Sequence, residues 1–257
     1  MAARRRSRMF LASSGAVAVV LGVGGCGSAD VDGAPVERKS FAFSGDALTV
    51  DSGDTDLEIV PADIEEVRVS RQVDGWVFMG EGPDATWRLE DGRLTLRVEC
   101  DALAADCDSL HRVQVPRGVA VTVEDDNGKV TAEGFATPLK VRSDNGAVLV
   151  RGSSGALDLT SDNGEVVVEG GTTSGQIVAR SDNGSVRLAL SAAPGRVEAV
   201  SNNGEVDIAL PDAPGAYDVD GRSDNGSVRI DVPTREGSPH VVTARSDNGE
   251  VVVRSAN

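Results

Sequence analysis

Seven near-identical copies of the tetrapeptide Ser-Asp-Asn-Gly constrain the fold of this chain more than any other feature. Each copy is followed by one variable residue and a valine, and successive asparagines lie 18, 18, 20, 20, 22 and 23 positions apart. A repeat at near-constant spacing indicates one structural unit stacked many times. The first copy has Asp125 in place of serine, and the fifth has Asn202 in place of aspartate. The repeated pairs are Asn127-Gly128, Asn145-Gly146, Asn163-Gly164, Asn183-Gly184, Asn203-Gly204, Asn225-Gly226 and Asn248-Gly249.

The segments around each tetrapeptide have the pattern of β-strands. In residues 139–151, Leu139 and Val141 alternate with polar residues before the turn, and Val148 and Val150 resume the alternation after it. Valine and period-2 alternation both favour pleated strands. A second Gly- or Pro-containing breaker follows in most units, so one unit is predicted to be strand, Asn-Gly turn, strand and second turn.

Two all-β architectures fit this unit. In a β-solenoid, parallel coils of about 18–23 residues stack at a spacing of about 4.8 Å. In the alternative, Asn-Gly forms tight hairpins within an antiparallel β meander or sandwich. The solenoid is favoured because stacked asparagines would hydrogen-bond as a ladder inside a corner, which explains asparagine in every copy. The asparagine is then expected on the inward face with Leu139, Val141 and Ser143, and the next glycine at a positive φ.

The N-terminus predicts export and lipid attachment. A basic segment with four arginines precedes an apolar stretch over residues 9–23, which is short for a membrane-spanning helix but suits a signal peptide. Small residues then precede Cys26, and this junction resembles the lipobox of bacterial lipoproteins, in which the cysteine is acylated. The alternative is an ordinary secretory signal with a chance cysteine. Residues 1–25 are thus predicted as signal peptide, and 26–40 as lipidated cysteine and flexible tether. The residues after the twin arginines fit the pattern of the Tat export pathway poorly, so general secretion is preferred.

The charge balance restricts the choice of partner. The chain has a formal charge of −16, and removal of residues 1–25, with four arginines and no acids, leaves about −20. Nucleic acid and anionic lipid are bound through basic patches, so this balance argues against both as partners.

Cys100 and Cys107 remain once Cys26 is assigned to a lipid. Two leftover cysteines in an exported protein usually pair, so a structural disulfide is predicted. A metal site or a redox pair are the alternatives, although the spacing is not Cys-x-x-Cys.

Residues 41–115 are less regular than the repeats over 116–257 and are predicted to form a β cap at the N-terminal end. Trp76, Phe78 and Trp87 are expected to nucleate its core. The chain stops soon after the last turn, so the C-terminal strand is expected to form the other end of the stack, either as a docking surface or blunted by Arg254.

These residues together carry a family resemblance. The lipobox, the Cys100-x6-Cys107 segment, the strand end at Val115-Pro116 and the Ser-Asp-Asn-Gly-x-Val units resemble the bacterial "putative adhesin" β-strand-repeat domain of unknown function. The resemblance covers about residues 41–257 and implies a solenoid-like β fold at the cell envelope. It assigns no catalytic or binding residues.

The sequence offers little catalytic chemistry. Its two histidines, His111 and His240, lie 129 positions apart, and no nucleophile or phosphate-loop motif occurs. We therefore expect no enzymatic activity. The aspartates of the repeats, among them Asp144, Asp162 and Asp182, could accept a backbone N–H within their own turn or could bind calcium along the stack.

Two functions remain open from the sequence. The first is a lipoprotein anchored at the extracytoplasmic face of the cell membrane, displaying an adhesion or envelope-interaction module to another envelope protein or surface. The second is a regulatory lipoprotein that modulates an envelope-stress or sensor system through protein contacts.

Overall fold

The computed structural model describes residues 31–213 and 215–256, apart from the side chains of 78, 79, 81 and 101–105. Every regular element in this part is a β-strand except a single 3-10 turn, Val31–Gly33. The segments that contain the repeats pair in parallel with one another, which confirms the β-solenoid and excludes the antiparallel meander. The predicted signal peptide and Cys26 lie outside the described residues.

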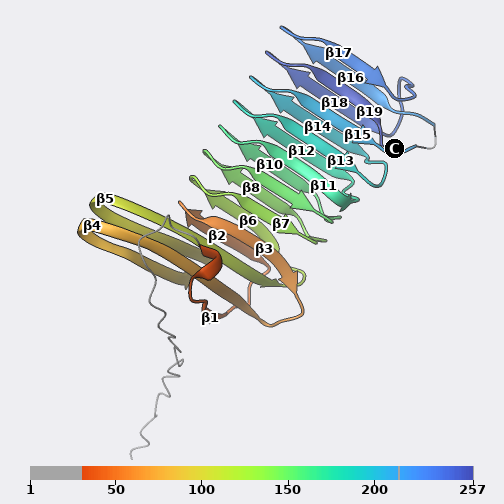
Figure 1. Cartoon of the computed structure of the whole chain (residues 1–257). Helices are drawn as coiled ribbons and strands as arrows, with labels where there is room; N and C mark the ends of the chain where they lie inside the picture. Colours follow the sequence, from red (N-terminus) through yellow and green to blue (C-terminus); the bar gives the residue numbers. More distant parts are fainter. Residues whose placement is uncertain (1–30, 214, 257) are drawn as a thin grey trace, which may run out of the picture.

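Each coil of the stack consists of two strands joined by a bend. After the bend, the second strand runs back along the opposite side of the coil (Figure 1). The bend contains Ser-Asp-Asn-Gly or one of its two near copies in all coils except the first, where residues 52–55 take its place. In stacking order the coils are β2–β3 (Ala47–Gly53, Asp56–Ala62), β6–β7 (Ala120–Asp125, Val130–Glu133), β8–β9 (Leu139–Ser143, Val148–Arg151), β10–β11 (Leu157–Ser161, Val166–Thr172), β12–β13 (Gln176–Ser181, Val186–Leu190), β14–β15 (Arg196–Ser201, Val206–Leu210), β18–β19 (Val241–Ser246, Val251–Ser255) and β16–β17 (Asp218–Ser223, Val228–Asp231).

The pairing register places equivalent residues of the repeat directly above one another. Leu157 pairs with Leu139 below and Ile177 above, and Ser161 pairs in the same way with Ser143 and Ser181. This register keeps the apolar positions of the strands facing inward, because a shift by one residue would turn the whole set outward.

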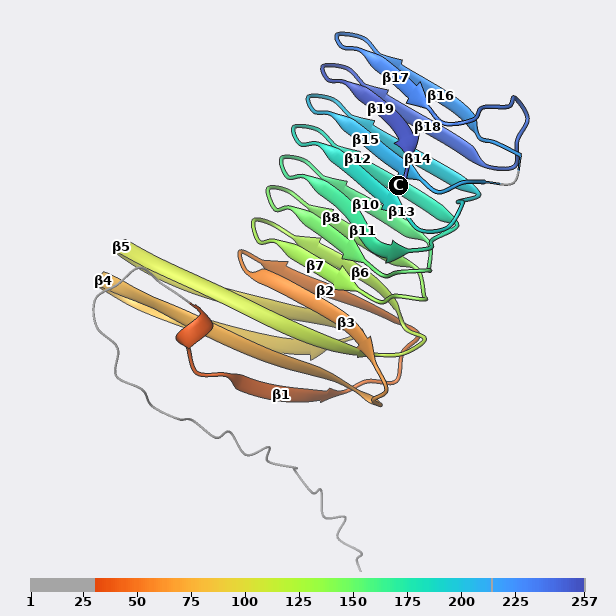
Figure 2. The ribbon, with the colours of Figure 1, turned by 45° about the vertical axis from the view of Figure 1, so that its right-hand side comes forward.

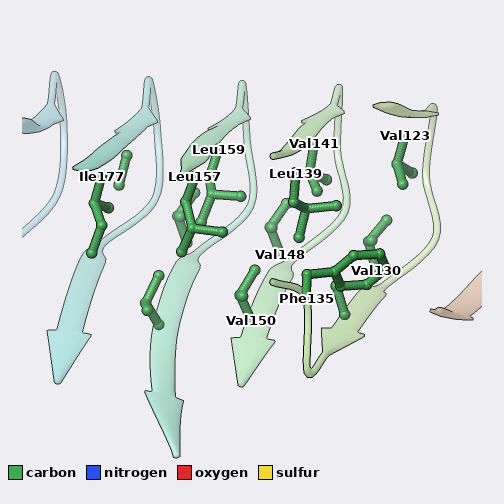
Figure 3. Packing of buried hydrophobic residues seen from close by; sticks show 14 of the residues in the cluster. Val123, Val130, Phe135, Leu139, Val141, Val148, Val150, Leu157, Leu159 and Ile177 are labelled. Carbon is green, nitrogen blue, oxygen red and sulfur yellow. The ribbon is translucent and has the colours of Figure 1, made fainter. Parts of the chain in front are cut away.

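The core is a column of aliphatic side chains between the two strands of each coil (Figure 3). Leu139, Val141, Val148 and Val150 are all buried, as are their counterparts in most coils. Phe135 adds one aromatic ring where the chain passes from β7 to β8. Valine and leucine fill a narrow two-strand coil without large rings, which accounts for the low aromatic content of 3%.

The order of the last two coils differs from their order in the sequence. Strand β18 pairs with β14 on one side and with β16 on the other, and β19 lies in the same way between β15 and β17. The C-terminal strand is therefore an interior strand, and the prediction that it forms the end of the stack is wrong. The exposed end is formed by β16 and β17 (Figures 1 and 2).

The other end of the stack is covered by a long hairpin. Strands β4 (Glu66–Glu90) and β5 (Arg93–Pro116) pair antiparallel, and the edge strand β1 (Glu37–Ala42) pairs with β4. The first residues of β5 pair with β2 and its last residues pair with β3, so one strand covers both sides of the first coil. The middle of the hairpin projects beside the stack as an arm (Figure 2).

The structure changes two details predicted for the N-terminal part. Strand β1 begins at Glu37, inside the segment expected to be tether, and the side chain of Gln72 donates a hydrogen bond to the carbonyl of Val31 at 2.7 Å. Trp76 is 49% exposed, so it does not nucleate a cap core, whereas Trp87 packs on the core with Arg71 4.1 Å from its ring centre. Within the described residues, no helix has the length and the apolar character that a bilayer crossing requires.

Candidate functional site

The serine of the repeat is an interior residue in most coils, where it joins consecutive coils. The hydroxyl of Ser161 accepts a hydrogen bond from the N–H of Gly164 at 2.8 Å and donates one to the carbonyl of Gly146 in the preceding coil at 2.9 Å. Ser181 repeats both bonds with Gly184 and Gly164. Because buried polar groups are costly unless they are paired, the serine satisfies two backbone groups that would otherwise be orphaned at the bend.

The asparagines form the expected ladder, but they do so on the outside of the bend. The amide of Asn145 donates to the side-chain oxygen of Asn127 at 2.7 Å, and Asn163 donates to Asn145 at 2.8 Å. The ladder continues in stacking order through Asn183, Asn203, Asn248 and Asn225. The prediction of inward asparagines is wrong because the period-2 alternation ends at the serine, where the backbone turns.

The glycine of each bend is required for a different reason from the one expected. None of the seven bend glycines is among the residues with positive φ. Instead, a Cβ on Gly146 would overlap the carbonyl oxygen of Gly128, and a Cβ on Gly164 would overlap that of Gly146. The backbones of successive bends therefore lie too close together for any side chain.

The aspartates stand on the exposed surface of the bends. Asp144 and Asp162 accept no hydrogen bond from a backbone N–H of their own turns. The serine hydroxyl accepts that bond instead, from the glycine N–H, so the expected Asx-type contact is wrong. Asp182 accepts a hydrogen bond from Asn202 of the next coil at 3.0 Å. Within the described ranges, no three His, Cys, Asp or Glu side chains converge as ligands of one ion.

Calcium binding along the row of Asp144, Asp162 and Asp182 stays a prediction. Stacked carboxylates about 4.8 Å apart repel one another, and a bound cation would relieve that repulsion. Millimolar calcium should then raise the melting temperature by linkage, and Asp162→Asn should reduce the rise. A melt of both proteins that is unchanged by calcium and by chelation would show that the row is part of the scaffold alone.

Asp125 is buried at the position that serine occupies in the other copies. Its carboxylate accepts hydrogen bonds from Ser52 at 2.7 Å and from Ser143 at 3.0 Å. Burial raises the pKa of Asp125 to about 6, against the lowering effect of these bonds. The departure from Ser-Asp-Asn-Gly marks the position in the sequence, but its burial was not predicted.

His111 is a second buried titratable residue, placed where β5 meets β3. Its Nδ1 lies 2.8 Å from the hydroxyl of Thr55, while its Nε2 has no hydrogen-bond partner within the described structure. Burial, helped by the positive charge of Arg71, lowers the pKa of His111 to about 4. The side chain is therefore neutral at physiological pH and closed to solvent, which suits a structural residue.

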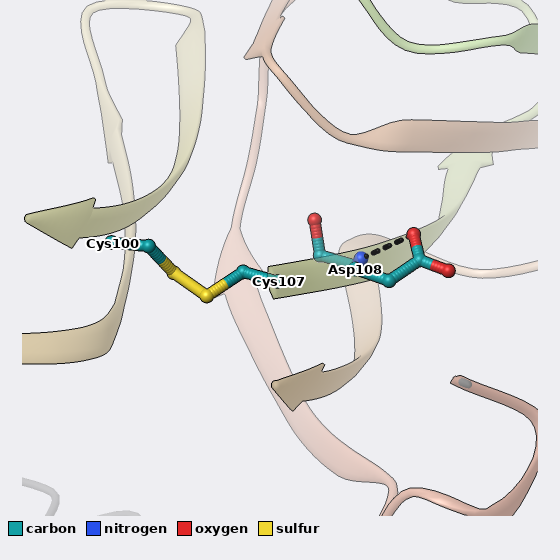
Figure 4. The surroundings of a disulfide bond; sticks show 4 residues. Cys100, Cys107 and Asp108 are labelled. Carbon is teal, nitrogen blue, oxygen red and sulfur yellow. Dashed lines mark hydrogen bonds between the residues drawn. A yellow bond between two sulfur atoms is a disulfide. The ribbon is translucent and has the colours of Figure 1, made fainter. Parts of the chain in front are cut away.

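The predicted disulfide is confirmed. Cys100 and Cys107 are bonded within β5, where the strand folds back on itself in the arm (Figure 4). The bond closes a short loop, so it fixes the arm rather than the stack.

A shallow groove of about 480 Å³ lies on the outer face of the first coil and the cap. Arg38, Arg68 and Arg112 line it together with Ser70, and Arg112 is also bonded to Glu58 at 2.7 Å. The net charge of the chain conceals this local cluster, which sequence reasoning missed because the residues come from β1, β4 and β5. Its chemistry suits carboxylate or phosphate groups.

The open end of the stack is the most unusual surface. Val228 and Ile230 of β17 are 43% and 38% exposed, whereas the equivalent Val251 and Val253 of β19 are completely buried. Apolar side chains that would fill the core are thus presented at the end of the stack.

Comparison with known proteins is consistent with this architecture. Residues 46–255 match the profile of the family described as Toastrack DUF4097. The chain belongs to this family. No curated protein matches the Toastrack chain. A solved structure described as a "putative adhesin" from Bacteroides fragilis aligns with a TM-score of 0.52 and 14% identity, covering 86% of this chain and 97% of that chain.

Two further solved structures match this Toastrack chain less closely. One, described as a "putative adhesin" from Parabacteroides distasonis, has a TM-score of 0.41 and 11% identity and covers 86% of this chain and 98% of its own. The other, a "putative cell adhesion protein" from Clostridium sporogenes, has a TM-score of 0.38 and 10% identity, with coverage of 87% and 100%. The likeness to the Bacteroides fragilis structure, at 14% identity, concerns the fold alone.

Proposed function

We propose that this protein is a lipoprotein of the extracytoplasmic membrane face that displays a non-catalytic, adhesion-type β-scaffold. The main support is the asymmetry of the stack. Its first coil is covered by the hairpin, and its far end presents the exposed apolar side chains of Val228 and Ile230 (Figure 1). A scaffold of this form holds its exposed end away from the surface to which it is tethered.

The sequence and the relatives support the same reading. The lipobox-like junction before Cys26 supplies an attachment point eleven positions before β1. The disulfide suits an oxidising compartment. The Bacteroides fragilis protein of similar fold is described as a "putative adhesin", which is in line with adhesion as the general role.

The arrangement of polar residues favours a scaffold over an enzyme. Serine, asparagine and glycine recur at most bends and take part in bonds between neighbouring coils, so their repetition serves the stack. An active site needs a singular constellation of groups. His111 is buried in the cap, and His240 bonds to the carbonyl of Pro194 in a loop between coils at 2.8 Å.

Acylation of Cys26 tests the anchor directly. Cells that express the chain are fed an alkyne-bearing fatty acid, and the purified protein is conjugated to a fluorophore. The wild-type protein should be labelled and should sediment with membranes, because two acyl chains hold a protein far more firmly than one. Cys26→Ser should lose the label, and Cys100→Ser/Cys107→Ser should keep it. An unlabelled wild-type protein would overturn the lipoprotein assignment.

A further inference from the structure

The end formed by β16 and β17 has the properties of an unfinished sheet. On one side, β16 (Asp218–Ser223) pairs with β18 and β17 (Val228–Asp231) pairs with β19. Within the described residues, no named strand pairs with the other side of β16 or β17. Among the residues that the structure describes, the one bridge on the outer side joins Tyr217 to Thr234. Free edges with exposed apolar residues are templates for another strand.

We propose that this end pairs with the same end of a second copy of the chain, through antiparallel β17–β17 pairing centred on Ile230. The order of residues in β17 is Val-Arg-Ile-Asp, followed by Val232. In this register Ile230 lies opposite Ile230 of the second copy, and Val228 lies opposite Val232. Arg229 lies opposite Asp231 and Asp231 opposite Arg229, so two cross-strand ion pairs form on the outer face.

Strand β16 is self-complementary in the same arrangement. Pairing centred on Gly221 places Asp220 opposite Arg222 of the second copy, and Arg222 opposite Asp220. A Cβ on Gly221 would lie 3.3 Å from side-chain atoms of both Ile230 and Val228, so Gly221 and Ile230 face each other across the coil. One two-fold axis perpendicular to the stack therefore satisfies both strands at once, which makes a closed dimer.

Pairing of two open ends is favoured over head-to-tail stacking of the chains because the two ends of the stack differ. The first coil is already paired with β5 on both of its sides, so it offers no edge to the open end of another chain. Like ends can meet only by turning one stack upside down. The covered ends of the two chains then point in opposite directions.

This geometry has a consequence that rests on the proposed membrane anchor. Eight coils make a stack roughly 34 Å tall, and the ten residues between Cys26 and Glu37 extend at most about 35 Å. The carbonyl of Val31 is also bonded to Gln72 at the covered end. Two paired chains are thus anchored at opposite ends, which suits contact between two facing membranes.

Cysteine cross-linking tests the pairing in the whole chain. Directly opposed residues of an antiparallel pair have Cβ atoms about 5 Å apart, close enough for a disulfide after small adjustment. Under mild oxidation, Ile230→Cys should give a disulfide-linked species of twice the chain mass. Arg187→Cys, on an outward position of β13 in the middle of the stack, is the matched control and should stay monomeric. Equal dimer yields from the two variants would overturn the proposal.

Charge exchange tests the register. Arg229→Asp places two aspartates opposite each other, and Asp231→Arg places two arginines opposite each other, so each should reduce Ile230→Cys cross-linking several-fold. The double exchange restores both pairs and should restore the yield. Thermal melts control for the loss of the contact between Arg229 and Glu250 at 3.3 Å within the chain. A cross-linking yield that is unchanged by both single exchanges would contradict this register.

Vesicles separate this proposal from the anchor. The acylated chain, with natural Ile230, is reconstituted into phosphatidylcholine vesicles, and binding is followed by flotation and clustering by light scattering. Flotation with clustering that Arg229→Asp abolishes supports the bridging geometry. Flotation without clustering overturns bridging but leaves the anchor intact. Failure to float counts against the anchor, while the cross-linking result still decides the pairing.

Discussion

Replacing Gly164 with alanine should lower the free energy of unfolding by about 3 kcal/mol or more. The new Cβ would overlap the carbonyl of Gly146, which is backbone on the neighbouring bend and cannot swing away as a flexible side chain would. The coils would have to separate, and the bonds that Ser161 makes with Gly164 and Gly146 would lengthen with them. Chemical denaturation monitored by circular dichroism measures the loss.

Gly175→Ala is the matched control for this substitution. Gly175 also lies in a turn between strands, but a Cβ there would meet no atom within 4 Å and its φ is not in the left-handed region. Its alanine variant should unfold within about 0.5 kcal/mol of the wild-type protein. If Gly164→Ala were as stable as Gly175→Ala, the close stacking of the bends would be wrong.

Asp125→Asn should change how stability depends on pH. A buried carboxyl with a pKa raised from 3.8 to about 6 contributes stability that is present below pH 4 and lost as the pH rises through 6. A shift of about two units corresponds to about 3 kcal/mol. Asp125→Asn removes this contribution, so its unfolding free energy relative to wild type should be about 3 kcal/mol higher at pH 7.5 than at pH 4.

His111 changes the stability of the protein over the same pH range as Asp125, but in the opposite direction. Its pKa is lowered from 6.5 to about 4, so the stability of the neutral side chain is present above pH 6.5 and is lost as the pH falls through 4. The two groups therefore nearly cancel in the wild-type protein. Denaturation series at pH 4, 5.5 and 7.5 for wild type, Asp125→Asn and His111→Gln should show opposite slopes in the two variants. Parallel curves for all three proteins would contradict the burial of these groups.

The sequence predicts the stack well because its signal is repeated. Seven bends with a following valine indicate parallel coils, and the alternation around Leu139 and Val148 identifies the inward residues. For asparagine and glycine within the bend, the local pattern predicts the wrong direction and the wrong backbone conformation. The direction of Asn145 depends on where the extended backbone ends, and the need for Gly146 depends on the distance between coils, neither of which a local pattern contains.

The two ends of the stack show why the remainder was not predictable. Coil β2–β3 has no Asn-Gly pair, yet Val50 and Ile59 are buried in line with the repeats. The order of β16–β17 and β18–β19 depends on the loops between coils. After β15 the chain skips the adjacent position in the stack to form β16–β17, and it then returns to form β18–β19 in the skipped position. Periodicity identifies equivalent coils, but it does not determine which coils are adjacent in the stack.

Everything inferred for the open end depends on the order of the last coils, so that order is the first thing to measure. Spin labels are attached in pairs at outward positions of β14, β18 and β16, namely Val200, Arg245 and Arg222. Residue 200 pairs directly with 245, and 245 with 222, so 200 and 222 are separated by an intervening strand. Dipolar broadening should be stronger for the 200/245 pair than for the 200/222 pair, with backbone spacings of about 5 and 10 Å. The reverse order would place the C-terminal coil at the end and contradict the open β16–β17 surface.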